Sequence, residues 1–195
     1  SFWSSFSNRE AMFRVLIYVA LIIGAIIMTH GDDDGIILPP KIASAHVVLL
    51  PIIRKSEDRA PVMDFTEKLA RELKTKPYHH RKLVVEIDDR EIGGARGWDW
   101  IKKGIPVRVE IGPRDIAKNS VFVGRRDQAP NESKAIDRDQ FVDEIPHILD
   151  EIQDNLFQRA LAYREEHTVA IENEKAFYEF FTPQNVEKPE IHGGF

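Results

Sequence analysis

The feature that most constrains this 195-residue chain is a strand–helix–strand pattern that begins at residue 46. The run HVVLLPII at 46–53 is short, apolar and rich in β-branched residues, which is typical of a buried strand in a parallel sheet. An amphipathic segment follows from Ser56, a good N-cap residue. Its apolar residues recur at helical spacing: Val62, Phe65, Leu69 and Leu73. The run KLVVEID at 82–88 is a second strand, and strands joined in this way are expected to lie parallel in one sheet.

Two further strands are expected downstream. PVRVEIG at 106–112 alternates as a strand should, and SVFVGRRD at 120–127 is again rich in β-branched residues. We expect a turn at 113–118 between them and a loop at 128–136. The predicted fold class is therefore α/β, with a mixed, largely parallel sheet, helices on both faces and a long helix afterwards.

The long helix is predicted from Asp137 or Asp139 to about Glu166. Its buried stripe is formed by apolar residues at helical spacing: Phe141, Ile145, Ile148, Ile152, Leu156, Ala160 and Tyr163. Pro146 lies inside this pattern and is expected to kink the helix or to divide it into two. One more helix is expected near 173–181.

Near the start of the chain, residues 15–28 form an uninterrupted apolar run of 14 residues, with Arg9 and Arg14 upstream. A membrane-spanning helix needs about 18 apolar residues or more, so a buried strand or a core helix is favoured over a membrane segment. We expect a poorly covered core element that exposes apolar surface. Deleting residues 1–35 is then expected to raise solubility and to leave the melting transition of the remainder nearly unchanged.

The segment that follows marks a turn and a boundary. GDDDG at 31–35 is a turn signal, because aspartate and glycine favour tight turns. The pair Pro39-Pro40 fits neither a helix interior nor a central strand, so we place a domain boundary there.

Composition limits the chemistry open to the chain. Hydrophobic residues make up 43% and charged residues 30%, which is typical of a soluble globular protein. The absence of cysteine excludes disulfides, thiolate zinc sites and cysteine nucleophiles, and it is consistent with a reducing cytoplasm. Because the net charge is -5, any nucleic-acid site must be a local patch.

No catalytic residue and no metal site are predicted from motifs. The sequence holds no G-x-S-x-G elbow, no P-loop and no H-E-x-x-H. A glycine-rich run follows a strand but lacks the G-x-G start of a dinucleotide loop: Gly93, Gly94 and Gly97. The pair His79-His80 and the aspartates at 32–34 and 88–89 are not paired at metal-ligand spacing, so turn chemistry is the favoured interpretation.

The segment 88–115 is the richest in groups that can contact nucleic acid. Arginines such as Arg90 can donate to guanine O6 and N7, and carboxylates can accept from guanine N1 and N2. Trp98 offers a stacking face for an unstacked base. An aspartate beside an arginine is more often a local ion pair, so the spacing alone leaves both interpretations open.

Three blocks, in this order and spacing, resemble the prolyl-tRNA synthetases of the archaeal and eukaryotic type, which are class II aminoacyl-tRNA synthetases. They are IMTHGDDDGIILPPKIA (27–43), KGIPVRVEIGPRDI (103–116) and LFQRALAYREEHT (156–168). The similarity continues in residues 177–195 and covers about four-fifths of the chain. The resemblance implies four parts: a truncated, divergent tail of the catalytic domain (1–40), the anticodon-binding α/β domain (41–136), a long helical segment (137–168) and the start of a truncated C-terminal domain (169–195).

The resemblance also implies which residues read the tRNA. The family motif K-G-V-P-x-R-x-E-x-G-P-[KR]-D falls on residues 103–115. In the family it reads the two guanines that proline anticodons share, and the readers implied here are Arg108, Arg114 and Asp115. Lys103 belongs to the same motif, and Trp98 and Arg90 complete the set of expected anticodon contacts. Many relatives carry an acidic residue where this chain has Ile101, so one polar contact of the family is missing.

For the parent enzyme, the resemblance implies ligation of proline to tRNA(Pro) with ATP and Mg²⁺, a cytoplasmic location and a homodimer formed through the catalytic domain. The family arginine that holds ATP falls on Leu21 in register, so this chain alone is expected to be inactive and to bind no cofactor. Residues 1–21 are open to interpretation as a misread gene end. We expect no membrane partner, and the alternative is a membrane-tethered interaction domain that reuses the same fold.

Overall fold

The computed structural model describes residues 2–90, 95–183 and 187. By its internal contacts the chain separates into two compact units, Ser1–Leu156 and Phe157–Phe195. The first unit contains the sheet and its covering helices. The second holds the last turns of a long helix and the short helix α6 (Glu174–Phe181), which begins at the N-cap residue Asn173.

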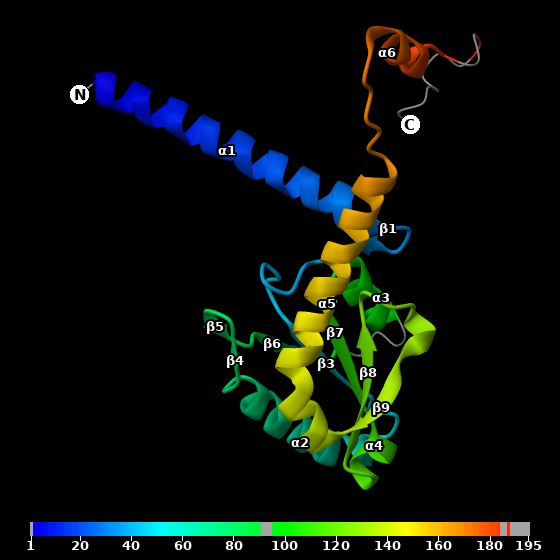
Figure 1. Ribbon diagram of the computed structural model, residues 1–195. Helices are drawn as coiled ribbons and strands as arrows, with labels where there is room; N and C mark the ends of the chain where they lie inside the picture. Colours follow the sequence, from blue (N-terminus) through cyan, green and yellow to red (C-terminus); the bar gives the residue numbers. More distant parts are fainter. Residues whose placement is uncertain (1, 91–94, 184–186, 188–195) are drawn as a thin grey trace. The chain divides into compact units, whose positions relative to one another are not determined.

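The first unit is built on a five-stranded sheet with the order β6-β3-β7-β8-β9 (Figure 1). Its strands are β3 (Val47–Pro51), β6 (Val85–Ile87), β7 (Val107–Ile111), β8 (Ser120–Arg125) and β9 (Lys134–Asp137). β3 pairs in parallel with β6 and with β7, whereas β8 is antiparallel to both β7 and β9. The predicted mixed α/β sheet is therefore confirmed, including the parallel strands β3 and β6 on either side of the amphipathic helix that follows Ser56.

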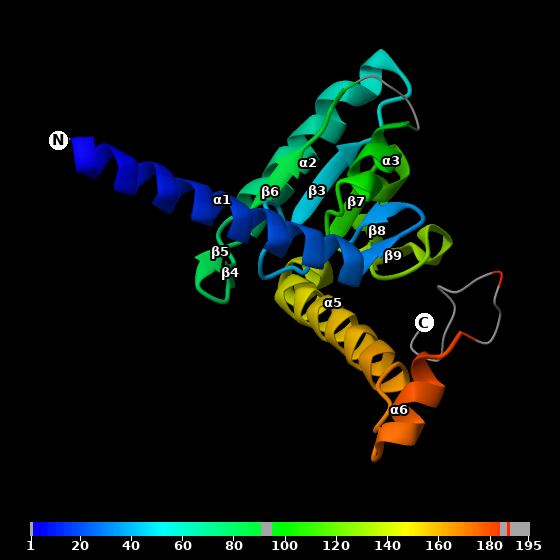
Figure 2. The ribbon, with the colours of Figure 1, turned by 90° about the horizontal axis from the view of Figure 1, so that it is seen from above.

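One face of the sheet is covered by α2 (Arg59–Leu73) and by the first part of α5 (Arg138–Glu166). Figure 2 shows α2 running beside β6 and β3. The main core joins alternate strand residues to both helices, with Leu69 and Leu73 from α2 and Phe141 and Ile145 from α5 among its members. The predicted apolar stripe of α2 thus faces the sheet, as expected for an amphipathic helix. The predicted stripe of α5 is buried from Phe141 to Leu156, but its last members are not, because Ala160 is half-buried and Tyr163 is exposed.

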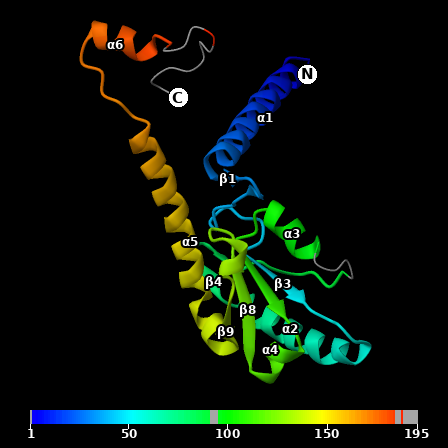
Figure 3. The same ribbon diagram turned by 90° about the vertical axis from the view of Figure 1, so that its right-hand side faces the viewer.

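The opposite face is covered only in part. The helix α3 (Ala95–Lys102) packs there, and a small cluster forms under it from Ala45, Val48, Leu50 and Ile105, with Trp100 against it. Figure 3 shows α3 and α5 on opposite sides of the sheet. Further along β7 and β8, Glu110 and Phe122 remain exposed on the face that α3 leaves open. This face of the sheet therefore has a part that is packed under α3 and an open part that carries polar and aromatic side chains.

Several local predictions need correction. The turn expected at 113–118 is mostly the short helix α4 (Pro113–Ala117), which has proline at its first position, where the missing N–H costs little. The loop expected at 128–136 is wrong at its end, because it contains a 3-10 turn (Pro130–Glu132) and most of β9. The strand expected at 82–88 is shorter, since Arg81–Lys82 (β5) pairs instead with Pro77–Tyr78 (β4) in a separate hairpin.

The helix α5 has no break at Pro146 and is continuous over its 29 residues. Pro146 deprives Val142 of one backbone partner, which normally destabilises a helix. Ile145 and Leu149 on either side of it are fully buried against the sheet. We conclude that this packing keeps the helix intact through the proline.

The N-terminal apolar run is helical, so its interpretation as a strand is wrong. The helix α1 spans Phe2–His30, and its side chains between Ala11 and Thr29 are mostly exposed. The window Ala11–His30 is long and apolar enough, at 20 residues and a mean hydropathy of 2.5, to cross a membrane by length and composition alone. The 14-residue estimate was too short because the helix continues through small and polar residues on both sides.

The turn at 31–35 is confirmed and is attached to the first unit. Gly31–Asp32 (β1) pairs with Gly35–Ile36 (β2), and Gly35 has a φ of +129° that favours glycine. The buried guanidinium of Arg126 donates to both carboxylate oxygens of Asp32, at 2.7 and 2.5 Å. Arg126 also donates to the carbonyl oxygens of Gly35 and Ile101, so it joins the hairpin to α3.

Candidate nucleic-acid interface

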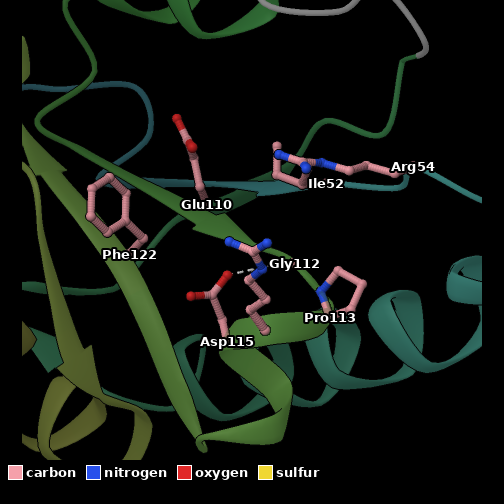
Figure 4. Close-up of a pocket in the computed structure, with 8 residues that line it drawn as sticks. Ile52, Arg54, Glu110, Gly112, Pro113, Asp115 and Phe122 are labelled. Atoms are coloured by element: carbon pink, nitrogen blue, oxygen red, sulfur yellow. Dashed lines mark hydrogen bonds between the residues drawn. The ribbon is translucent and has the colours of Figure 1, made fainter.

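A cleft of about 270 Å³ lies on the open sheet face, where β7 ends and α4 begins (Figure 4). It is lined by residues from the ends of β3 and β7, from α4 and from β8: Ile52, Arg54, Glu110, Gly112, Pro113, Arg114, Asp115 and Phe122. Two of the six residues expected to contact the anticodon, Arg114 and Asp115, are among them. The sequence motif therefore folds around a concave site, as the carboxyl end of a strand in an open sheet often does.

Asp115 is held in position by the start of α4. Its Oδ2 accepts a hydrogen bond of 2.8 Å from the backbone N–H of Gly112, the N-cap residue (Figure 4). Within the described residues no partner engages Oδ1, which remains available to a ligand. The carboxylate is therefore both a helix cap and a fixed acceptor at the rim of the cleft.

Arg114 is exposed and forms no hydrogen bond or ion pair with any residue that the structure describes. The local ion pair with Asp115 that the sequence left open does not form. Arg54, exposed at the end of β3, is likewise without an ion pair within the described ranges. Two exposed cationic side chains thus line the same cleft as the fixed carboxylate.

Arg108 lies on the same sheet face, one alternation before Glu110 on β7. It is only 8% exposed, and it makes no hydrogen bond to any of the described residues. Burial lowers the pKa of its guanidinium, and nearby Arg126 acts in the same direction while Glu110 opposes it. A buried cation without a direct partner is unfavourable, so a hydrogen-bond acceptor from a ligand would stabilise the Arg108 guanidinium.

Space for Arg108 depends on Gly124, its direct neighbour on β8. A Cβ at Gly124 would lie 2.9 Å from Arg108 Nη2 and 2.7 Å from Ser133 Oγ. The absence of a side chain therefore lets the guanidinium lie against the sheet.

Arg90 has a different environment. Its Nε and Nη2 donate to the two carboxylate oxygens of Asp88 at 2.9 and 2.7 Å, and Nη2 also lies 3.4 Å from Asp99. Asp88 is buried and also accepts from Trp100 Nε1 at 2.7 Å. The hydrogen bonds from Arg90, followed by the one from Trp100, hold the pKa of Asp88 far below its usual range. Here the ion-pair interpretation describes the geometry, and Arg90 supports α3.

The other two expected contacts lie on or just after α3. Trp98 is 48% exposed, so one part of its indole is open to solvent. The Nζ of Lys103 lies 4.3 Å from the ring centroid of Trp100, a cation–π distance. Gly97 is helical in α3, whereas Gly93 and Gly94 lie outside the described residues. The structure therefore does not bring Trp98 and Lys103 into the lining of the cleft.

Two cleft residues were not singled out from the sequence as contacts. Glu110 was identified only as part of the motif, and Phe122 only as part of a strand. They are direct cross-strand partners, Glu110 on β7 and Phe122 on β8, so their side chains share one face. The available signal was alternation, because Glu110 has the parity of Arg108 and not that of the buried Val109 and Ile111.

No group of three or more histidine, cysteine or carboxylate side chains could hold a metal within the described ranges. His79 Nε2 lies 2.9 Å from Asp150 Oδ1. The cleft instead offers guanidinium donors and carboxylate acceptors beside an aromatic ring. Those groups match the hydrogen-bonding edges and the flat face of a nucleobase.

The comparisons with known proteins agree with this geometry. The profile of the anticodon binding domain family matches residues 46–148. The chain is 46% identical over 176 residues to a proline–tRNA ligase of Protochlamydia amoebophila, and 47% identical over 162 residues to one of Bdellovibrio bacteriovorus. These matches cover 89% and 83% of this chain but 35% and 32% of the relatives, so the chain spans about a third of their length.

A solved structure shows the same similarity. The prolyl-tRNA synthetase from Cryptosporidium parvum, complexed with L-proline and AMP, matches with a TM-score of 0.71 at 34% identity. The match covers 80% of this chain and 31% of that one. The shared part includes the mixed sheet, and the fold predicted from the sequence is confirmed.

Proposed function

Since this chain belongs to the anticodon-binding domain family, we propose that its first unit binds the anticodon of a proline tRNA, as part of a proline–tRNA ligase. One observation carries the proposal: the cleft at the end of β7 presents the fixed carboxylate of Asp115 beside Arg114, with the unpaired Arg108 on the same sheet face. Proline anticodons share two guanines, and these side chains match a guanine edge.

The mechanism of recognition is direct contact with base edges. A guanidinium can donate two hydrogen bonds to guanine O6 and N7, and a carboxylate accepts from N1–H and the N2 amine. Adenine presents a donor at the position of O6, so the same arrangement rejects it. Arg108 and Arg114 supply donors, and Oδ1 of Asp115 supplies the acceptor.

The remaining expected contacts take supporting roles in this proposal. Lys103 contacts a phosphate, because an exposed cation near the sheet attracts the RNA backbone irrespective of sequence. Trp98 stacks on a neighbouring unstacked base. Arg90 acts through α3, because it pairs with Asp88, which also accepts a hydrogen bond from Trp100 in the last turn of that helix.

The test is a titration of the full chain with proline tRNA and with an anticodon-swapped tRNA at two salt concentrations. Asp115→Asn keeps an oxygen for the Gly112 cap but loses the carboxylate, and it should reduce the preference for the proline anticodon by about 1–3 kcal/mol. Asp115→Ala also removes the cap. Equal affinity of the unmodified chain for both RNAs would mean that the proposal is wrong.

Ligation with ATP belongs to the proposed parent enzyme, a cytoplasmic homodimer acting with Mg²⁺. The residues present do not fit an ATP phosphate site, because the family arginine is replaced by Leu21, an exposed apolar side chain in α1. We therefore expect proline-dependent pyrophosphate exchange by this chain to stay at background. Clear exchange would contradict the register that places the family arginine at Leu21.

A second candidate, a membrane-tethered interaction domain, is favoured by α1 alone. A helix that is apolar all round and unburied is suited to a bilayer, and 20 residues match the thickness of the hydrocarbon core. Arg9 precedes this window, Arg14 lies near its start, and aspartates follow it. Positively charged flanks of a membrane helix tend to stay in the cytoplasm, so the N-terminal end of α1 would lie there. The cleft, which follows α1 in the chain, would then lie on the opposite side of the membrane, where there is no tRNA.

The two candidates are thus mutually exclusive in this orientation, and cell fractionation distinguishes them. A membrane anchor resists carbonate and is released by detergent, whereas an exposed helix on a soluble protein gives a soluble or an aggregated chain. The cleft supports the first candidate, because a tether does not need a guanine-matching site.

A further inference from the structure

We propose that Glu110 and Phe122 complete the cleft as a subsite for a single guanine, with Phe122 as the stacking platform and Glu110 as a second acceptor for its Watson–Crick edge. This inference rests on the proposed function and adds two specificity residues to it. Figure 4 shows the Phe122 ring, Glu110 and Asp115 around the same opening, from β8, β7 and α4 respectively.

The position of Phe122 is unusual for an aromatic residue on an interior strand. β8 lies between β7 and β9, yet Phe122 is 38% exposed, because none of the helices that the structure describes covers this part of the face. Its cross-strand neighbours are Glu110 on one side and the small Ala135 on the other. One ring face is therefore accessible, and a nucleobase can stack on it.

Glu110 supplies what Asp115 lacks. The Watson–Crick edge of guanine presents donors at N1 and at N2, and both need acceptors. Asp115 commits Oδ2 to the N–H of Gly112 and keeps Oδ1. Glu110 is exposed, and no described residue pairs with it by hydrogen bond or salt bridge. Its carboxylate interacts with Arg108 only through electrostatic attraction, so its oxygens are available as acceptors. Two carboxylates from adjoining elements then accept from one base stacked on Phe122.

The cleft lining has two carboxylates and two guanidiniums, so it carries no net charge that would select a phosphate over a neutral base. In this proposal the carboxylates contact the base, and Arg54 and Arg114 are available to the RNA backbone. The alternative without a binding role is that Glu110 is a solvated surface charge and that Phe122 is an isolated exposed apolar residue, which is common on protein surfaces. The two interpretations predict opposite effects of removing the charge.

The experiment uses the full chain and an RNA hairpin that carries the proline anticodon. In two further hairpins one of the guanines is replaced by inosine, which lacks the N2 amine. Glu110→Met keeps an unbranched side chain of similar length and removes both acceptor oxygens. Phe122→Leu keeps an apolar side chain and removes the ring, and Phe122→Tyr restores a ring.

We expect Phe122→Leu to weaken binding of the proline hairpin on the order of 10-fold and Phe122→Tyr to recover most of it. For the unmodified chain, inosine at one anticodon position should cost on the order of 10-fold. That penalty should nearly disappear in Glu110→Met, while the penalty at the other position persists. Equal melting temperatures of the variants establish that the fold is retained.

Two outcomes overturn the inference and leave the proposed function intact. In one, Glu110→Met strengthens binding of every hairpin alike and keeps the inosine penalty, as loss of a bystander negative charge does. In the other, Phe122→Leu binds as the unmodified chain does. If the unmodified chain does not distinguish the proline hairpin from an anticodon-swapped one, the proposed function fails and the subsite fails with it.

Discussion

Removing the Asp32 carboxylate should destabilise the fold, although Asp32 lies before the proline pair that the sequence suggests as a boundary. Asp32 accepts two hydrogen bonds from Arg126, whose side chain is 4% exposed, and one from the N–H of Asp34. Without Asp32, the Arg126 cation stays buried with only the carbonyl oxygens of Gly35 and Ile101 as acceptors.

The size of the effect follows from this geometry. Breaking a buried ion pair by removing one partner costs about 3–5 kcal/mol. Because 41% of the Asp32 side chain is exposed, water can reach part of the vacated space, so Asp32→Ala should cost about 2 kcal/mol. The hydrogen bond with Arg126 lowers the pKa of Asp32, so this contribution is present above the unfolded pKa and is lost as pH falls through the folded value.

The assay is urea unfolding of the full chain near neutral pH. The matched control is Asp33→Ala, which removes an exposed carboxylate from the same turn and should change the free energy of unfolding by less than about 0.5 kcal/mol. A paired deletion gives the same contrast, because loss of residues 1–28 spares Asp32 whereas loss of 1–35 removes it. Equal stability of Asp32→Ala and Asp33→Ala would refute the argument that the Arg126–Asp32 pair stabilises the fold. The expectation from the sequence, that deletion of residues 1–35 leaves the melting transition nearly unchanged, would then remain.

Three further predictions follow from single side chains. Burial lowers the pKa of His46 to about 4 from 6.5, so the folded state binds fewer protons between these values, and stability should fall by up to about 3 kcal/mol as pH drops through that window. Urea unfolding at pH 7 and 4.5 measures this loss, and His46→Gln should flatten it. Gly124→Ala should displace the Arg108 guanidinium and weaken RNA binding several-fold. Its cost in stability should stay below about 1 kcal/mol, because the new Cβ meets only the ends of side chains. The control Gly97→Ala, which has open space around it, should leave binding unchanged. Lys103→Met should weaken all RNAs alike and reduce the salt slope of binding by about 1, and a loss confined to the proline anticodon would contradict its role as a phosphate contact.

Most of the core could be predicted from the sequence because its signals are local and strong. The parallel pair β3 and β6 followed from two apolar runs on either side of one amphipathic helix, and the stripe of α5 followed from its period. The errors occur where tertiary contacts override local preference. β9 has the sequence KAID, which contains little β propensity, and it exists because β8 offers an unpaired edge. Pro146 is tolerated because buried neighbours hold its helix.

The candidate site was predictable only in part, for a different reason. Arg114 and Asp115 were found from the motif, and the structure places both at the cleft. Phe122 comes from a separate strand, and only the register of β7 with β8 brings it opposite Glu110. Register is a long-range property that the sequence of either strand does not specify by itself. The sequence likewise left the pairing of Arg90 open, since the buried acceptor Asp88 is set by the packing of Trp100 on it.

The double use of Asp115 bears on how a chain with a net charge of -5 can read RNA. Long-range attraction to phosphates is weak for such a chain, so recognition must depend on a few well-placed contacts. A free aspartate would lose rotamer freedom on binding, whereas Asp115 is already fixed by the N–H of Gly112 at the start of α4. Its helix cap therefore contributes to recognition as well as to folding. It follows that Asp115→Asn, which keeps the cap, should lose selectivity with little loss of stability, while Asp115→Ala should lose both.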